Sequence, residues 1–132
     1  MSTVSTHVLD MVLGKPAAGI TMRLEKQDGG GWIEVTPEEG QRTAQAERVR
    51  DVPGPWTEVS RSVTDADGRC LLAQELPAGV YRLVFDTASY LGDQHRASIY
   101  PEVAITFSCT GEAHYHLPLL LSDHGYTTYR GS

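Results

Sequence analysis

Two histidines one residue apart, His114 and His116, are the side chains of this sequence best placed to do chemistry. They lie in a stretch, residues 113–121, that reads as a β-strand. Side chains alternate along a strand, so both imidazoles project from one face while Tyr115 points away. Such a pair supplies two metal ligands, or an acid/base group with a neighbour, or simply two rings on a solvated strand. A zinc site needs a third ligand, and no spacing selects one from the carboxylates or from His7, His95 and His124.

Two other parts of the chain offer chemistry that complements the histidines. His7 stands in a β-branched stretch that predicts a strand. Arg69 directly follows an Asp-Gly turn, where its permanently charged, directional guanidinium is suited to clamp an anion or a developing oxyanion. The sequence ends on Tyr129, Arg130, Gly131 and Ser132, and two tyrosines in the last seven residues are large enough to anchor this segment.

Nucleophile and phosphate-binding motifs are absent from the sequence. There is no Gly-x-Ser-x-Gly, and neither cysteine has a histidine partner indicated by spacing. The glycine run at 29–31 separates two predicted strands and opens no helix, unlike a phosphate-binding loop. Acid/base work by histidine with stabilisation by arginine remains, and this combination suits hydrolysis by an activated water.

Length and charge exclude several classes of protein. The 132 residues fit one domain with a hydrophobic core of its own, 40% of them are hydrophobic, and the net charge is −6. The 11 Lys and Arg are scattered among 17 Asp and Glu, which argues against a nucleic-acid partner. The longest apolar run, near Leu117, is far shorter than the ~20 residues of a membrane-spanning helix.

The start of the sequence and its cysteines indicate a cytoplasmic protein. Residues 1–7 have neither the basic start nor the apolar segment of a secretory signal. Cys70 and Cys109 lack metal-type spacing, and in a reducing compartment we expect them to be packed thiols.

Short strand patterns separated by turn residues predict an all-β antiparallel sandwich. Strands are expected at residues 3–13, 20–25, 32–35, 60–64, 69–72, 80–85, 102–109 and 113–121, with a short helix within 88–96. Two pairings follow from the short connections: 20–25 with 32–35 as a hairpin, and 102–109 with 113–121 as a closing pair.

Residues 36–59 interrupt this pattern and are interpreted as a surface insertion into a single domain spanning 1–132. Thr36, Pro37 and the two glutamates that follow are typical of a helix start, and residues 44–48 could continue the helix. The segment lacks an apolar stripe wide enough to dock firmly, so we expect a short helix on an exposed loop.

The motifs together resemble the 5-hydroxyisourate hydrolases, the transthyretin-related enzymes of purine catabolism. The resemblance covers nearly the whole chain except the insertion. In this family a much shorter link joins the strands on either side of it. It rests on four segments: 5–10 (Ser-Thr-His-Val-Leu-Asp) with 14–17, 65–69 (Asp-Ala-Asp-Gly-Arg), 114–122 (His-Tyr-His-Leu-Pro-Leu-Leu-Leu-Ser), and 126–132 (Tyr-Thr-Thr-Tyr-Arg-Gly-Ser).

The resemblance implies a transthyretin-like sandwich of two four-stranded sheets with one short helix, assembled as a homotetramer, a dimer of dimers, with its sites in a channel between dimers. It also implies roles for residues at matching positions. The catalytic set is His7, Arg69 and His116. The substrate-binding set is Tyr129, Arg130, Gly131 and Ser132, to which we add His114 as a neighbour of His116 on the same face.

The implied reaction opens the six-membered ring of 5-hydroxyisourate, a small-molecule substrate, to give 2-oxo-4-hydroxy-4-carboxy-5-ureidoimidazoline, and needs no metal or cofactor. One of His7 and His116 takes a proton from water, the other assists, and Arg69 stabilises the attacked carbonyl oxygen. The main alternative is a non-catalytic carrier of small ligands with the same transthyretin-like fold, because a scaffold alone does not determine function. A zinc protein organised by His114 and His116 is the third hypothesis.

Overall fold

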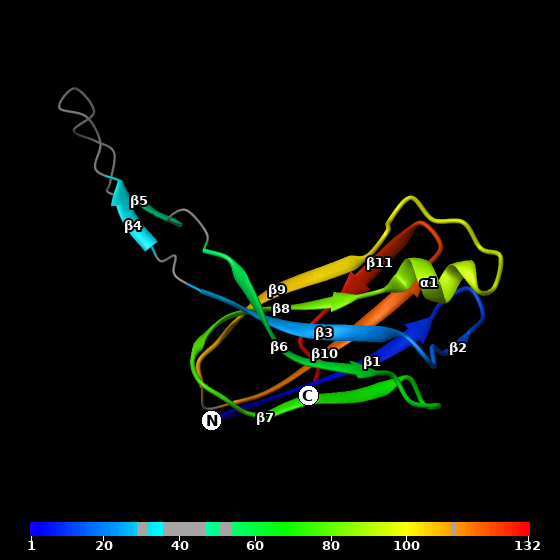
Figure 1. The fold of residues 1–132 in the computed structure, drawn as a ribbon, viewed down its shortest axis with the longest axis horizontal. Helices are drawn as coiled ribbons and strands as arrows, with labels where there is room; N and C mark the ends of the chain where they lie inside the picture. Colours follow the sequence, from blue (N-terminus) through cyan, green and yellow to red (C-terminus); the bar gives the residue numbers. More distant parts are fainter. Residues whose placement is uncertain (29–31, 36–46, 51–53, 112) are drawn as a thin grey trace.

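The computed structural model describes residues 1–28, 32–35, 47–50, 54–111 and 113–132, and it shows two facing β-sheets with one short helix (Figure 1). The first sheet contains β7 (Arg69–Leu76), β1 (Ser2–Asp10), β10 (His114–Ser122) and β11 (Gly125–Thr128), and the two-residue β2 (Lys15–Pro16) pairs with the end of β1. The second contains β6 (Trp56–Val63), β3 (Thr21–Gln27), β8 (Gly79–Phe85) and β9 (Val103–Cys109). The predicted all-β sandwich is confirmed.

One strand pair departs from the antiparallel pattern. Strands β1 and β10 run parallel, whereas β1 pairs antiparallel with β7 and β2, and β10 pairs antiparallel with β11. The parallel pair brings the beginning of the chain beside its last long strand. This pairing places β1 between the two strands that carry Arg69 and the histidine pair.

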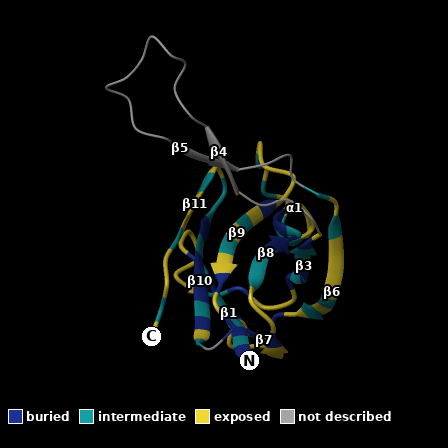
Figure 2. Cartoon of the chain, turned by 90° about the vertical axis from the view of Figure 1, so that its left-hand side faces the viewer, coloured by how far each residue is buried: buried dark blue, intermediate teal, exposed yellow. Residues whose placement is uncertain are grey.

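Alternation along β1 separates a core face from an outer face (Figure 2). Residues at even positions, from Ser2 to Asp10, are buried, and those at odd positions are only half-buried. The buried set meets the second sheet in one apolar core, whose fully buried members include Leu24, Tyr81, Leu83, Phe85 and Leu119. Burying each large apolar side chain contributes about 1.5–3 kcal/mol, so this core holds the outer face rigidly in place.

The helix α1 (Thr87–Gly92) begins one residue before the predicted range of 88–96 and ends inside it. Asp86 caps its start, because the carboxylate accepts hydrogen bonds from the Ser89 amide at 3.3 Å and from the Ser89 hydroxyl at 2.8 Å. Among the described residues, no helix is long and apolar enough to cross a membrane.

A buried ion pair ties the end of β1 to the segment after α1. The Asp10 carboxylate, fully buried, accepts hydrogen bonds from Arg96 at 2.6 Å and from the Tyr90 hydroxyl at 2.7 Å. Arg96 also bonds Asp123, in the turn between β10 and β11, at 2.6 Å. Burial alone raises the pKa of Asp10, but the bonds from Arg96, Tyr90 and the Leu13 amide outweigh it and hold the pKa at about 2.

Two predicted pairings are wrong. Strand β3 pairs with β6 and β8, whereas β4 (Trp32–Val35) pairs with β5 (Glu47–Arg50) in a separate two-stranded sheet. Strand β9 pairs with β8 in the second sheet, and β10 belongs to the first. A short connection in a sandwich joins strands of one sheet or crosses between sheets, and alternation alone does not distinguish the two.

The region interpreted as an insertion contains strand where a helix was expected. Residues 47–48 belong to β5, so the helix predicted through 44–48 is wrong there, and its remaining part, within 36–46, lies outside the described residues. Pairing with β4 satisfies the backbone of this segment without requiring the apolar stripe that a docked helix needs. Residues 56–59 belong to β6 of the sandwich itself.

Candidate active site

Three neighbouring strands of the first sheet bring the predicted catalytic residues to one face. His7 on β1 is directly opposite Arg69 on β7 and opposite Pro118 on β10. Two residues earlier on β1, Ser5 is opposite His116. Odd positions of β1 and even positions of β10 face away from the core, so His7, Arg69 and His116 share the outer face of this sheet.

The turn before β7 places Arg69. Asp65 accepts hydrogen bonds through one side-chain oxygen from the amides of Asp67 and Arg69, both at 2.9 Å. Gly68 has a φ of +75°, and a Cβ there would clash with the backbone oxygen of Val8. Glycine is therefore required for the turn to pack against β1, and this packing fixes the start of β7 and its arginine.

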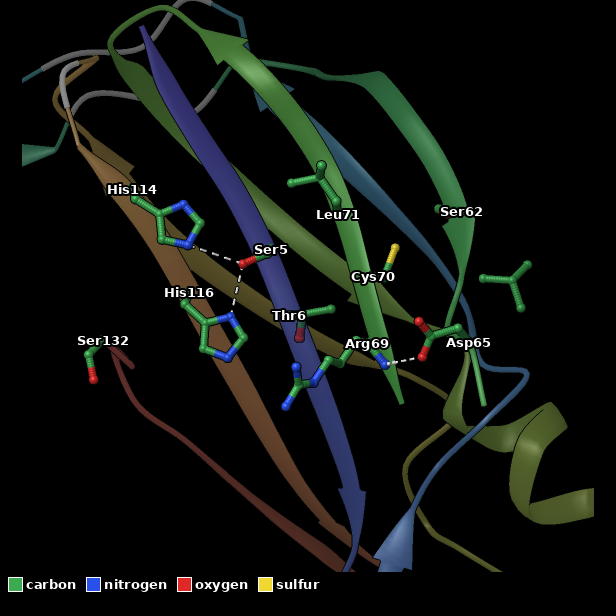
Figure 3. Close-up of a pocket in the computed structure, with 11 residues that line it drawn as sticks. Ser5, Thr6, Ser62, Asp65, Arg69, Cys70, Leu71, His114, His116 and Ser132 are labelled. Atoms are coloured by element: carbon green, nitrogen blue, oxygen red, sulfur yellow. Dashed lines mark hydrogen bonds between the residues drawn. The ribbon is translucent and has the colours of Figure 1, made fainter. Parts of the chain in front are cut away.

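The two imidazoles of β10 stack over the outer face, as alternation predicts, with ring centroids 6.5 Å apart and planes inclined by 10°. Both are bonded to one hydroxyl of β1: Ser5 Oγ lies 2.9 Å from Nδ1 of His116 and 3.4 Å from Nε2 of His114 (Figure 3). Nδ1 of His114 is also hydrogen-bonded to the Thr3 hydroxyl. Tyr115, between the histidines, is buried in the core.

A pocket of ≈ 690 Å³ opens beside these groups. Its lining includes Ser5, Arg69, His114, His116 and Ser132. Neighbouring residues of β1, β6, β7 and the turn before β7 complete it. Figure 3 shows the first four of the named residues on the adjacent strands β7, β1 and β10, with Ser132 of the tail approaching His116 from the opposite side to Ser5. His7 lies outside the lining, although it is close enough for its charge to act on His116.

The pKa of His116 lies below its ordinary value. Burial is the largest cause, because it disfavours the imidazolium form, and positive charge on His114, His7 and Arg69 adds to the effect. His116 is therefore neutral at physiological pH and has a nitrogen lone pair available for a proton. This is the state that a general base requires.

The last residues lie back along β10. The Gly131 amide donates a hydrogen bond of 2.7 Å to the His116 carbonyl, in an isolated antiparallel bridge. A Cβ on Gly131 would lie 2.7 Å from Cδ2 of His116, closer than packed carbon atoms approach. Only glycine permits this contact, through which the tail touches one edge of the imidazole.

The other tail residues differ in how closely they approach the pocket. Ser132 lines it, whereas the Arg130 guanidinium lies 4.6 Å from the centroid of the Tyr115 ring and bonds the His114 carbonyl at 3.5 Å. Tyr129 is 54% exposed. In this single chain Ser132 lines the pocket, Gly131 packs against His116, and Tyr129 is exposed to solvent.

Metal coordination and thiol chemistry are the other possibilities that the His and Cys residues offer. In the described ranges, no three His, Cys, Asp or Glu side chains gather closely enough to hold a metal ion. Cys70 and Cys109 are both free and buried, as expected for packed thiols.

Ser5 and Thr3 were not predicted as site residues. Their signal in the sequence is their spacing, two and four residues before His7, which puts them on its face of the strand. The parallel register with β10, which aligns them with the two histidines, is not encoded in either segment alone.

Comparison with known proteins places the chain in a family. Residues 4–131 match the model of the HIUase/Transthyretin family. The chain belongs to this family. A relative from Mus musculus, named 5-hydroxyisourate hydrolase, is 36% identical over 135 residues, which cover 99% of this chain and 96% of that protein. A relative of the same name from Caulobacter vibrioides is 36% identical and covers 100% of both chains.

The chain resembles solved structures of both the hydrolases and the transthyretins. The 5-hydroxyisourate hydrolase from Klebsiella pneumoniae has a TM-score of 0.71 and 32% identity, and covers 98% of this chain and 99% of its own. Transthyretin from Sparus aurata has a TM-score of 0.75 and 29% identity, and covers 97% and 95%. The fold does not discriminate between enzyme and carrier, but the full-length relatives favour the enzyme.

Proposed function

We propose that this chain hydrolyses 5-hydroxyisourate to 2-oxo-4-hydroxy-4-carboxy-5-ureidoimidazoline, a cyclic amide hydrolysis in urate degradation. The observation that carries the proposal is the convergence of His7, Arg69 and His116 on three adjacent strands of one face. These residues come from the beginning, middle and end of the sequence. The full-length similarity to hydrolases of this substrate supports the same conclusion.

His116 is the proposed general base. It is neutral because burial and neighbouring positive charge lower its pKa, and its Nδ1 is already engaged by Ser5. The free nitrogen, Nε2, lies on the side of the ring toward Arg69 in Figure 3. A water held there would lose a proton to Nε2 while its oxygen bonds to a ring carbonyl carbon of the substrate.

Arg69 is proposed to stabilise the developing negative charge, and His7 to orient the substrate. The negative charge that develops on the attacked carbonyl oxygen falls to the Arg69 guanidinium, whose position is fixed by the Asp65 turn. His7 is directly opposite Arg69 and is proposed to hydrogen-bond the substrate. When the carbon–nitrogen bond breaks, the leaving ring nitrogen takes the proton removed from water. The scheme uses side chains of this chain only.

The tail and His114 are proposed to bind substrate. Ser132 lines the pocket on the side away from Ser5, held there by the bridge between Gly131 and His116, and His114 lines it beside His116. Arg130 and Tyr129 complete this set, although Tyr129 is exposed in the single chain.

A homotetramer, built as a dimer of dimers, is the proposed assembly. Three consecutive apolar residues after β1, Met11, Val12 and Leu13, are 58%, 58% and 45% exposed, which is unusual for a run of large apolar side chains on a free surface. Sedimentation velocity tests the assembly: a species of four chains is expected, and a monomer at micromolar concentration would reject it. The cytoplasm is the proposed location, because both cysteines are buried free thiols.

The activity is tested with 5-hydroxyisourate generated freshly by urate oxidase. The purified chain is expected to accelerate the decay of substrate absorbance, and mass spectrometry should show addition of one water. A decay rate equal to the spontaneous rate rejects the enzyme. If the chain bound the substrate without accelerating its decay, the carrier hypothesis would replace the proposed function.

A further inference from the structure

A single hydroxyl links the two histidines of the site. Ser5 Oγ lies 2.9 Å from Nδ1 of His116 and 3.4 Å from Nε2 of His114, and the remaining nitrogen of His114 is bonded to the Thr3 hydroxyl. The parallel register creates this order by pairing Thr3 with His114 and Ser5 with His116. Hydroxyl and imidazole groups therefore alternate in one hydrogen-bonded chain across β1 and β10.

Two directions let the Ser5 proton bridge the two histidines. A neutral imidazole has one N–H and one bare nitrogen, and a serine hydroxyl has one proton to donate. If Nδ1 of His116 donates to Ser5, then Ser5 donates to Nε2 of His114, and Nδ1 of His114 donates to Thr3. If the direction reverses, Ser5 donates to His116, whose proton is then on Nε2.

The first direction is the one that prepares His116 to act as a base. Only in that state does Nε2, the nitrogen turned toward Arg69, lack a proton. The second direction leaves His116 with a proton on Nε2, ready to be given to a leaving nitrogen. The two directions thus correspond to the two halves of a hydrolysis.

We propose that Ser5 is a positioning residue that holds His116 in the reactive tautomer and relays its proton to His114; this inference rests on the proposed function. As Nε2 of His116 takes a proton from the attacking water, Nδ1 releases its proton to Ser5 Oγ. The Ser5 proton moves at the same time to Nε2 of His114. His116 is then neutral with a proton on Nε2, and His114 carries the positive charge.

The relay runs backward in the second half of the reaction. Nε2 of His116 gives its proton to the leaving nitrogen as the carbon–nitrogen bond breaks. His114 returns a proton to Ser5, and Ser5 returns one to Nδ1 of His116. All three residues recover their starting protonation, and the net transfer is one proton from water to the leaving nitrogen.

Burial and charge favour storage of the proton on His114. The His114 side chain is exposed, whereas His116 is half-buried and is faced by His7 from β1 and by Arg69 from β7. An imidazolium is better solvated at the exposed position, and the pKa of His116 is correspondingly lowered. On the tail side, Ser132 is an uncharged side chain in the pocket.

A matched pair of variants isolates the hydroxyl. Ser5→Thr keeps it, and Ser5→Val has nearly the same shape as Thr but lacks it, so the pair separates the hydroxyl from the added volume. The exposed Ser108→Ala in β9 of the other sheet is the control for loss of a strand serine. We expect kcat to fall about tenfold to a hundredfold in Ser5→Val, with KM changed less than about twofold, and Ser5→Thr to stay near the unmodified chain.

Two further measurements separate a relay from simple packing. Nitrogen-15 NMR of the full chain at pH 8 is expected to show the proton of His116 on Nδ1, and Ser5→Val should shift it toward Nε2. The dependence of kcat on the deuterium fraction of the solvent should be curved in the unmodified chain, because several protons move together, and linear in Ser5→Val.

The inference is overturned if Ser5→Val retains the unmodified kcat, or if the tautomer of His116 is the same in Ser5→Thr and Ser5→Val. The NMR result does not depend on the substrate. A chain that fails to accelerate 5-hydroxyisourate decay therefore rejects the proposed function, while an unchanged tautomer rejects the role of Ser5.

Discussion

The amide of Gly131 donates a hydrogen bond of 2.7 Å to the carbonyl of His116, and this bond lays the end of the chain against the proposed general base. The tail and the imidazole are therefore one structural unit. Contact of the two at this distance depends on the absence of a side chain at residue 131.

Replacing Gly131 by Ala is expected to lower kcat/KM about a hundredfold without unfolding the protein. The added Cβ would lie 2.7 Å from the His116 ring and 3.3 Å from Pro118, so either the tail lifts or the ring turns, and a displacement of about 1 Å suffices for such a loss. The Tm should stay close to that of the unmodified chain. Gly92→Ala is the matched control, because a Cβ there meets nothing within 4 Å. Equal activity of the two variants would contradict the role of the tail.

The acid limb of the pH–rate profile is expected to lie below the ordinary histidine value of about 6.5. His116 must be neutral to take a proton, and its pKa is lowered. We therefore expect kcat/KM to stay constant as pH falls through about 6.5 and to decrease only near the lowered pKa of His116. His114→Gln removes one of the positive neighbours and should move the acid limb to higher pH, although burial, the largest cause, remains. Exposed His124→Gln should leave the limb in place. A limb that stays fixed in His114→Gln would refute the coupling of the two rings.

Asp10→Asn is expected to destabilise the fold by about 3 kcal/mol, because Arg96 would keep its buried charge but lose its main partner. The pKa of Asp10 is lowered from 3.8 to about 2, so its ionised form contributes stability above pH 4, and this contribution is lost as pH falls toward 2. Urea unfolding between pH 7 and 2 should therefore show a weaker acid dependence in Asp10→Asn than in the unmodified chain. Exposed Asp93→Asn serves as the control, and identical acid dependence in all three proteins would count against the ion pair.

Alternation along single strands predicted the local geometry of the site. The shared face of His114 and His116 follows from period two, and so does the burial of Tyr115. The turn before Arg69 was also readable, because Asp-Gly signals a tight turn. These features depend on neighbours in sequence, which is why they were predictable.

Pairing between distant segments was not predictable in the same way. The parallel register that puts Ser5 opposite His116 depends on how the core packs, and neither segment encodes it alone. The assignment of β9 and β10 to different sheets was missed for the same reason. The convergence of His7, Arg69 and His116 was therefore expected from family resemblance and not from physical pattern.

The most direct test of the account compares initial rates of 5-hydroxyisourate decay for the unmodified chain, His116→Asn, His7→Asn, Arg69→Gln and the triple variant. Each single change is expected to lower kcat at least about a hundredfold, because base, substrate contact and oxyanion partner act on one transition state. For the same reason the triple variant should be little slower than the slowest single variant. A His116→Asn chain that keeps its rate within about twofold of the unmodified chain would contradict the central claim.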